Sequence, residues 1–252
     1  MKEHAKWQAG ISSCGPAEEG GACGFLGRKE ISVKGIRNPR IMTFVFFSVA
    51  AFCAFSFYFL DIPVANLAKS PPGEISDVFE VVTFLGRSTS YLVASCLLFI
   101  FFRYVRENGP YAERFLFVFL SVGVSGLLTD GLKTVFGRCR PKMFYLNGQY
   151  GFDFLQFHTK YEMNSFPSGH ATTVGALATV LWIVCPRYGI AGTLLAVLVM
   201  ASRIVLGAHF VSDVVFGAYV GFVTAVFFKM LSEKKTGASL RCPDLPRSEE
   251  GP

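Results

Sequence analysis

Residues 41–60 read IMTFVFFSVAAFCAFSFYFL, a stretch without a charged side chain. Because a helix rises about 1.5 Å per residue, this stretch is long enough to cross the roughly 30 Å hydrocarbon core of a bilayer. Arg40 and Asp61 border it sharply. It begins too far from residue 1, behind a polar segment with charges of both signs, to be a cleaved signal peptide. The stretch therefore predicts a transmembrane helix.

Five further stretches have the same apolar character, and they lie at residues 88–105, 115–136, 170–186, 188–207 and 209–229. The composition of the whole chain agrees, since 52% of the 252 residues are hydrophobic and only 17% are charged. A soluble domain carries about 25% charged residues, so the composition disfavours an ordinary cytosolic enzyme, a disordered chain and a coiled coil. We therefore expect an all-α polytopic membrane protein, a bundle of six transmembrane helices.

The predicted membrane domain covers residues 41–230 and is flanked by two polar tails. Residues 1–40 and 231–252 contain glycine, proline and charges of both signs, which is typical of flexible segments. Inside the domain, a segment at about 138–166 is too polar to span a membrane, and its Tyr and Phe residues fit an interfacial position. We expect this segment to be an external loop that caps the site.

The Lys and Arg residues are divided unequally between the two sides of six such spans. The side that carries both termini holds 16 of the 24, and the opposite side holds the other 8. Because cytoplasmic segments are enriched in Lys and Arg, both termini are predicted to be cytoplasmic. The chain has no Asn-x-Ser/Thr acceptor for N-glycosylation, which favours a bacterial source. The prediction is a multi-pass protein of the cell (inner) membrane whose opposite face is periplasmic or extracellular.

Ionisable residues interrupt several predicted spans at the same, outward end. Lys133 follows Arg114 by 19 residues, and Lys229 follows His209 by 20. Each interval is about 30 Å of helix, one membrane width. Charges at this depth are costly in lipid and usually mark a buried functional site. Three clusters share this face: KTVFGRCRP at 133–141, PSGH at 167–170 and SRIVLGAHFVSD at 202–213.

The clusters supply cations and a helix N-terminus, which are groups that bind phosphate. A transferring phosphoryl group spreads its charge over three oxygens, and its catalysis relies on positioning and electrostatic stabilisation. Lys133, Arg140 and Arg203 are predicted to grip those oxygens, the guanidiniums as bidentate forks and the Lys as a point charge. Ser168 and Gly169 open a predicted helix, where free backbone N–H groups and the positive dipole end form an anion site.

His209 and Asp213 indicate a nucleophile. They stand at positions i and i+4 of one helix, so their side chains share a face and can meet. A carboxylate that holds one imidazole N–H leaves the lone pair of the other nitrogen free to attack. His170 comes from another helix and is predicted to be the general acid that protonates the leaving group. A neutral nucleophile and a protonated acid predict a bell-shaped pH dependence of the rate.

Several alternatives stay open for these residues. The cations could be loop charges near lipid headgroups, and the histidines could be structural. The two histidines and Asp213 could instead hold zinc, although the three nearby cations would repel it. Ser168 could act only as a helix N-cap. Asp130 is interpreted as a partner that holds the Lys one turn later, whereas Arg138 either adds to the phosphate field or faces solvent.

Together the three clusters resemble the signature of the type 2 phosphatidic acid phosphatases, a family of membrane lipid phosphatases. That signature is Lys-x6-Arg-Pro, then Pro-Ser-Gly-His, then Ser-Arg-x5-His-x3-Asp, and the sequence matches every fixed position. The resemblance covers roughly residues 41–230. It implies a six-helix bundle related to the vanadium haloperoxidases, a phosphohistidine intermediate on His209, and no metal or other cofactor.

The expected function is hydrolysis, at the outer face, of a phosphate monoester or of the terminal phosphate of a diphosphate on a lipid. Candidate substrates are undecaprenyl diphosphate, phosphatidylglycerophosphate, phosphatidic acid and lipid A. One alternative is a lipid phosphate transferase. Another is a non-catalytic lipid-phosphate or anion transporter, for which two histidines and a carboxylate would be superfluous. An external face without recognition motifs does not suit nucleic acid, and no obligate protein partner is predicted.

Overall fold

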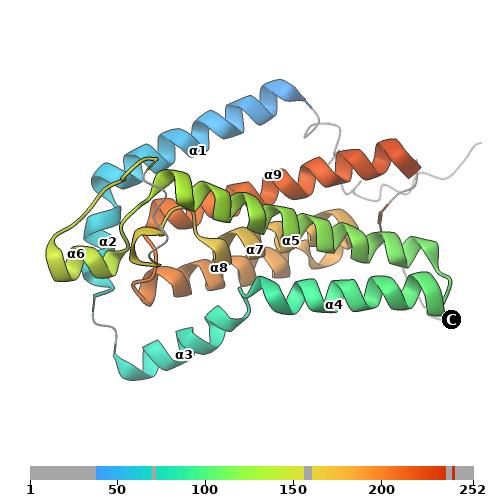
Figure 1. Ribbon diagram of the computed structural model, residues 1–252, viewed down its shortest axis with the longest axis horizontal. Coiled ribbons are helices and arrows are strands. Elements are labelled where there is room, and N and C mark those ends of the chain that lie inside the picture. The colour runs from blue at the N-terminus through green and yellow to red at the C-terminus, as the bar shows by residue number, and fades with distance from the viewer. Residues whose placement is uncertain (1–37, 70–71, 156–160, 237–239, 242–252) are drawn as a thin grey trace, which may run out of the picture. The chain divides into compact units, whose positions relative to one another are not determined.

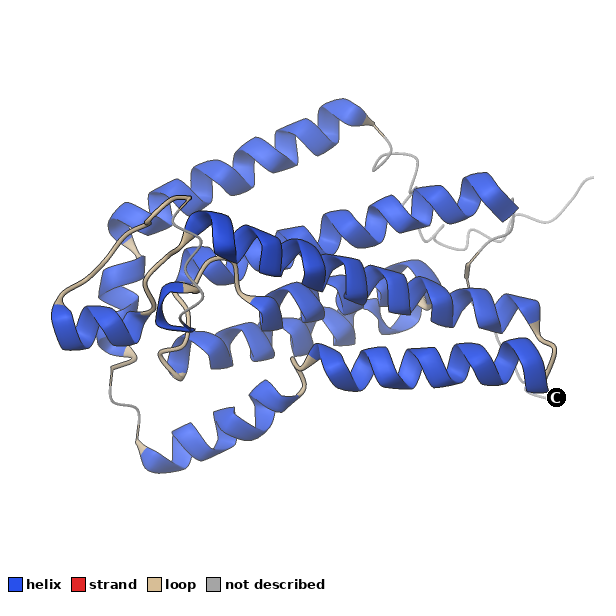
Figure 2. Ribbon diagram, viewed as in Figure 1, coloured by secondary structure: helices blue, strands red, loops and turns tan. Residues whose placement is uncertain are grey.

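The computed structural model describes residues 38–69, 72–155, 161–236 and 240–241, and the regular structure in these ranges is helical (Figure 1, Figure 2). The expected all-α class is confirmed. Residues 43–252 form one compact unit, which carries every predicted site residue. Of the other unit, residues 1–42, only 38–42 are described, where α1 (Pro39–Phe59) begins. Most of the predicted N-terminal tail therefore lies outside the described residues.

The predicted spans coincide with long helices. After α1 these are α4 (Ser88–Ile100), α5 (Gly109–Phe136), α7 (Gly169–Val184), α8 (Gly189–Val205) and α9 (Val211–Thr236). Within the described ranges, five helical stretches are long and apolar enough to cross a membrane, and one of them continues α4 through a π-helical turn, η1 (Phe101–Val105). The chain is therefore a polytopic membrane protein. With 16 residues, α7 is about 24 Å long, shorter than a bilayer core.

α7 packs against α5, α8 and α9 (Figure 1). Two glycines of α9 let its backbone approach α7 closely. A Cβ atom on Gly217 would lie 2.5 Å from the carbonyl oxygen of Ser168, and one on Gly221 would lie 2.2 Å from that of Thr172. This packing brings the starts of the two helices side by side, where the Ser168 amide donates to the Asp213 carbonyl oxygen at 3.0 Å.

Short helices join the long ones where the sequence predicts none. α2 (Asp61–Leu67) and α3 (Gly73–Phe84) fill the connection between the first two predicted spans, and α3 packs against α8. The predicted external loop contains α6 (Pro141–Asn147) and a 3₁₀ turn, η2 (Tyr161–Met163), while another such turn, η3 (Pro186–Tyr188), joins α7 to α8. Helices as short as α2 and α6 are too brief for a period of apolar residues to reveal them.

The bounds of α5 place the first cluster of the site. The side chain of Asn108 caps the first turn by accepting an amide hydrogen bond of 3.2 Å, and Pro110 stands in that turn. The helix ends at Gly137, whose φ of 54° is left-handed and therefore favours glycine. Because the chain turns there, Lys133 stays on the helix surface whereas Arg138 enters the interior.

The other end of the domain departs from the predicted boundary at residue 230. α9 runs on to Thr236, so the boundary falls inside a helix. Leu240 is buried in a cluster with Phe117. Arg114 Nε donates to the Leu240 carbonyl oxygen at 3.0 Å, and its Nη2 donates to that of Arg241 at 2.5 Å. This part of the predicted C-terminal tail therefore packs on the helices.

Candidate active site

The predicted site residues lie at one end of the helices, where α5 and α8 end and α7 and α9 begin. They come from four places in the sequence. Lys133 and Arg140 flank the end of α5, Ser168 to His170 open α7, Arg203 lies in the last turn of α8, and His209 and Asp213 flank the start of α9. The packing of α7 on α9 thus gathers residues from all three sequence clusters.

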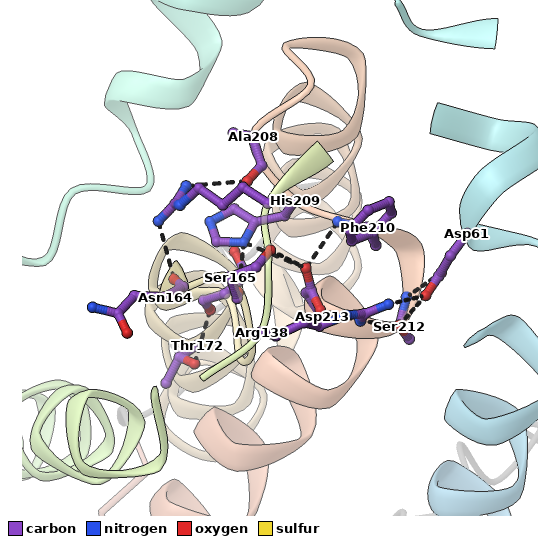
Figure 3. A network of polar contacts seen from close by, with 12 residues as sticks. Asp61, Arg138, Asn164, Ser165, Thr172, Ala208, His209, Phe210, Ser212 and Asp213 are labelled. Carbon is purple, nitrogen blue, oxygen red and sulfur yellow. Dashed lines mark hydrogen bonds and ion pairs between the residues drawn. The ribbon is translucent and has the colours of Figure 1, made fainter. Parts of the chain in front are cut away.

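His209 is buried and firmly oriented (Figure 3). Its Nδ1 lies 2.8 Å from the carbonyl oxygen of Ser165 and 3.8 Å from Asp213 Oδ2. Because a carbonyl oxygen only accepts, Nδ1 carries the hydrogen, and Nε2 of the neutral ring keeps its lone pair. The expectation that Asp213 itself would hold the imidazole N–H is therefore corrected: the Ser165 backbone holds it. Every residue has a backbone carbonyl oxygen, so the sequence could not show that this one is the acceptor.

Burial lowers the pKa of His209 from its ordinary 6.5 to about 4, because the charged imidazolium is poorly solvated inside the protein. Arg140 and Arg203 lower this pKa further by repulsion, and Asp213 opposes them. At neutral pH the ring is consequently uncharged. An uncharged imidazole with a free nitrogen lone pair is the form that can attack phosphorus.

Asp213 is fully buried and holds the loop that carries Ser165. Its Oδ2 accepts from Ser165 Oγ at 2.5 Å and from the Phe210 amide at 2.9 Å. Its Oδ1 accepts from Arg138 Nη1 (Figure 3). Asp213 therefore reaches His209 in two ways: directly, at 3.8 Å from Nδ1, and through Ser165, whose hydroxyl it binds and whose carbonyl binds the ring.

His170 lies in the first turn of α7, close to the second histidine of the site. Electrostatic interactions link it to His209, Arg203 and Arg87. Its ring packs on Gly86, where an added Cβ would lie 2.7 Å from His170 Cδ2. Gly86 and Arg87 join α3 to α4 and escaped the sequence analysis, because they belong to none of the three clusters. The only available signal was the position of Arg87 at the outward end of a predicted span.

Lys133 and the start of α7 form the first part of a cation-rich cluster. Lys133 Nζ donates to Asp130 Oδ1 at 2.9 Å, so the predicted supporting contact is present. The same Nζ would lie 3.4 Å from a Cβ atom on Gly169, which places the ammonium beside the helix N-terminus. Ser168 is the N-cap residue, but its buried hydroxyl has no hydrogen-bond partner among the described residues. The capping alternative for this hydroxyl is therefore wrong, and the hydroxyl stays available to a ligand.

Arg203 forms the second part of the cation-rich cluster. Its Nη1 donates to Thr83 Oγ1 at 2.7 Å, which ties α8 to α3. Its Nε is buried and has no hydrogen-bond partner among the described residues. A buried guanidinium with a spare donor fits an anionic ligand, because leaving that donor unpaired costs free energy.

Arg140 is more heavily engaged with the protein than the sequence suggested. Its Nε and Nη1 donate to the carbonyl and hydroxyl oxygens of Tyr161, at 2.9 and 3.0 Å. Nη1 also donates to the Ala208 carbonyl oxygen at 3.0 Å, and Nη2 donates to that of Asn164 at 3.2 Å. Of the five N–H donors of a guanidinium, four are taken and one on Nη2 is left.

Arg138 neither faces solvent nor lies free beside phosphate. It is fully buried, its Nη2 lies 2.7 Å from Asp61 Oδ2, and it also pairs with Asp213. Asp61 was interpreted only as the border of the first span. The signal that could have found it is a carboxylate at the end of a long apolar segment, a position where charges usually have partners.

The zinc alternative finds little support in the geometry. In the part of the chain that the structure describes, no three His, Cys, Asp or Glu side chains are grouped to hold a metal ion. Both carboxylate oxygens of Asp213 already accept hydrogen bonds from protein donors. The site is instead an uncharged imidazole surrounded by cations and spare donors, an arrangement suited to attack on a phosphoryl group.

Residues 114–236 match the sequence model of the PAP2 superfamily. The chain is 33% identical over 193 residues to the lipid A 1-phosphatase of Rhizobium johnstonii, which covers 69% of this chain and 75% of the relative. It is 32% identical over 189 residues to the lipid A 1-phosphatase of Rhizobium etli, covering 69% of this chain and 80% of the relative. The chain belongs to the PAP2 superfamily. The resemblance stated from the sequence clusters is thereby confirmed.

The fold is also similar to that of a solved structure. The crystal structure of Aquifex aeolicus LpxE matches with a TM-score of 0.51 and 24% identity, covering 67% of this chain and 94% of that one. As a PAP2 enzyme, the protein is an integral membrane lipid phosphate phosphatase of a metal-independent family. The cation-rich cluster around His209 and His170 supplies the groups that such a reaction requires.

Proposed function

We propose that this PAP2 phosphatase releases the phosphate from position 1 of lipid A. The proposal rests on sequence similarity to two lipid A 1-phosphatases. Each is about one third identical to this chain over 69% of its length. The cation-rich cluster supports a phosphorylated lipid headgroup as substrate, because its spare donors gather at one end of apolar helices. The hydrocarbon chains of such a substrate can stay in the bilayer.

In the proposed reaction, Nε2 of His209 attacks phosphorus while the bond from phosphorus to the sugar oxygen breaks. His170 donates a proton to that leaving oxygen, and a phosphohistidine forms on His209. His170 then takes a proton from water, the water oxygen attacks phosphorus, and the P–N bond breaks to release phosphate. The hydrogen bond from Nδ1 to Ser165 supports the first step, because it leaves Nε2 unprotonated.

We assign the phosphate oxygens to the donors that the protein leaves unused. These are the Ser168 hydroxyl, the backbone at Gly169, the Lys133 ammonium and the Arg203 guanidinium, with the remaining N–H of Arg140. Their positive charge would stabilise the transition state, in which negative charge is spread over the three non-bridging oxygens of the phosphoryl group, while the attacking nitrogen and the leaving oxygen lie in line. Asp213 keeps its proposed role as an orienting group, exerted through Ser165.

We further propose that all six long helices cross the membrane, with both termini in the cytoplasm and the site at the outward, periplasmic face. The Lys and Arg bias supports this orientation. The short α7 is surrounded by other helices, so its polar first turn can lie below the headgroups without meeting lipid. The proposed membrane domain is residues 41–230, with cytoplasmic tails at 1–40 and 231–252.

The test is phosphate release by the purified protein in detergent with EDTA, beside His209→Ala. The panel contains doubly phosphorylated lipid A, phosphatidic acid, phosphatidylglycerophosphate and undecaprenyl diphosphate, and mass spectrometry locates the phosphate that is lost. We expect EDTA-resistant loss of the 1-phosphate of lipid A by the parent protein and none by His209→Ala. Faster release from another lipid would replace the substrate, and appearance of the phosphate on a second lipid would indicate a transferase. Binding without release would indicate a carrier, and inhibition by EDTA would revive the metal alternative.

A further inference from the structure

A buried ion cluster lies behind the nucleophile, and two of its three charged residues, Arg138 and Asp61, are fixed positions in none of the three sequence motifs (Figure 3). Arg138 lies between two carboxylates: its Nη2 is 2.7 Å from Asp61 Oδ2, and its Nη1 binds Asp213 Oδ1. Arg138 Nη1 also donates to Ser212 Oγ at 2.6 Å. The three charged side chains are at most 1% exposed, so water does not screen their interaction.

Asp61 also caps the N-terminus of α9, although it lies far from that helix in the sequence. Its Oδ1 accepts from the backbone amide of Ser212 at 3.0 Å, and its Oδ2 accepts from the Ser212 hydroxyl at 2.5 Å. Ser212 lies in the first turn of α9, whose free amides and positive dipole end favour a carboxylate. Ser56 Oγ holds Asp61 from the other side at 2.8 Å. The cluster therefore fixes the start of the helix that carries Asp213.

Aromatic rings enclose the Arg138 guanidinium and keep it in place. The rings of Phe57, Tyr150, Phe152 and Phe210 have their centroids 4.6 to 5.5 Å from its Cζ. Cations at such distances from aromatic rings are attracted to them, and more strongly where water is absent. The guanidinium is thus held by two carboxylates and a ring cage, and it has little freedom to move away from Asp213.

A buried ion cluster is a costly way to hold a fold together. Apolar residues of similar volume often stabilise a protein as well or better, because burying charges loses their hydration. Here the cluster leads to the reacting group through named contacts: Asp61 to Arg138, Arg138 to Asp213, Asp213 to the Ser165 hydroxyl, and the Ser165 carbonyl to His209 Nδ1. With two carboxylates and one cation, its net charge is −1.

We infer that Arg138 and Asp61 are positioning residues for the nucleophile His209, and that they act through Asp213 and Ser165. This inference rests on the proposed function, in which His209 attacks the phosphate. Arg138 and Asp61 fix where the Asp213 carboxylate lies, and Asp213 fixes the loop whose carbonyl sets the tautomer and direction of the His209 ring.

The first test is Asp61→Asn, which keeps the shape of the side chain and removes its charge. We expect kcat to fall about ten- to a hundredfold, the usual effect of losing a partner that orients a reacting group, with KM changed less than about twofold. The acid limb of kcat/KM should also move to lower pH. In the variant, Arg138 fully neutralises Asp213, so His209 meets less negative charge and binds its proton more weakly.

The pH readout separates positioning from stability. The charged and titratable groups that face His209 are Asp213 on α9, Arg140 before α6, Arg203 on α8 and His170 on α7, and Asp61→Asn changes none of them. Arg138→Met should shift the limb in the opposite direction, because it leaves two uncompensated carboxylates. A fall in thermal stability with kcat and the pH limb unchanged would overturn the inference.

The matched control is Arg114→Met, another buried arginine with two hydrogen bonds to backbone carbonyl oxygens, at the opposite end of the helices. It should lower the Tm without moving kcat or the pH limb. If Asp61→Asn fails to fold, Ser56→Ala removes one hydrogen bond to Asp61 and should lower kcat a few-fold; an unchanged kcat there would overturn the inference. Activity surviving in His209→Ala would refute the proposed function, whereas an inactive His209→Ala beside a fully active Asp61→Asn would refute the positioning role alone.

Discussion

The two ends of the helix bundle both bury cations, yet they use them differently. At the end where α5 starts and α9 ends, Arg114 binds the carbonyl oxygens of Leu240 and Arg241. Lys229 there pairs with Glu233 at 3.4 Å, one helical turn away. The Arg114 contacts fasten residues 240–241 to the helices, whereas the Lys229 pair lies within α9. The acceptors are backbone carbonyl oxygens and a carboxylate of the same helix. Among the described residues, neither cation lies beside a group that could react.

At the opposite end, the cations surround the two described histidines, His170 and His209. A spare donor alone does not distinguish the two ends, since Arg114 Nη1 lacks a hydrogen-bond partner among the described residues just as Ser168 Oγ and Arg203 Nε do. The distinguishing feature is the combination of spare donors with an uncharged, oriented imidazole. A site of phosphoryl transfer is recognised by such convergence rather than by any one buried charge.

The largest expected difference between the two ends is at His209. His209→Ala removes the attacking nitrogen, so kcat should fall by about 10⁴-fold or more. Arg114→Met at the other end should leave kcat within about twofold. The measurement is phosphate release from lipid A by both variants, with the Tm as a check on folding. Comparable losses in both would mean that the assay reports folding, and the comparison between the ends would fail.

Arg203 should show the next largest effect. Arg203→Met removes a donor from the charge that develops on the phosphate oxygens, and the loss of one such donor costs about 10²- to 10³-fold in kcat. Lys229→Met is the matched loss of a buried cation at the other end and should keep its activity. Arg203→Lys should recover only part, because an ammonium lacks the planar fork. A raised KM with an unchanged kcat would instead make Arg203 a residue of ground-state binding only.

Gly86 tests the placement of His170 without touching the ring itself. Gly86→Ala puts a methyl group 2.7 Å from His170 Cδ2 and 2.9 Å from Val199 Cγ1, so the ring must shift. A misplaced general acid should lower kcat about 10- to 100-fold. Gly126→Ala is the control, because an added Cβ there meets nothing within 4 Å. Equal activity of the two variants would show that the position of His170 is not critical.

Much of the fold and of the site could be predicted from the sequence because both have strong local signals. Long apolar stretches predicted α1, α4, α5, α7, α8 and α9, and counting residues along them placed the charged clusters at one end. The short α2 and α6 were not predicted, since a few residues carry no clear period. The predicted boundary at 230 falls inside α9, because polar residues continue the last turns of that helix.

The contacts that the sequence missed join residues that are distant in sequence or use the backbone. Asp61 and Arg138 stand 77 residues apart, and neither has a neighbour that suggests the other. The acceptor that holds His209 is the backbone carbonyl of Ser165, and every residue has such a carbonyl. Spacing rules find partners on one helix, such as His209 and Asp213, but in this protein the hydrogen bond came from a loop and left that pair 3.8 Å apart.

The smallest expected effect is the change in kcat/KM between pH 7 and pH 5. His209 must be neutral to attack, so activity is lost as the pH falls through its pKa, which burial lowers to about 4. Between pH 7 and pH 5 its titration should therefore reduce kcat/KM by only about 10%, whereas an ordinary pKa of about 6.5 would reduce it about 25-fold. The substrate phosphate itself titrates near pH 6, so its ionisation, followed by phosphorus NMR, is divided out. An acid limb that remains near pH 6.5 after this correction would mean that the nucleophile is not the buried ring of His209. The uncharged imidazole would then no longer distinguish this end of the molecule from the other.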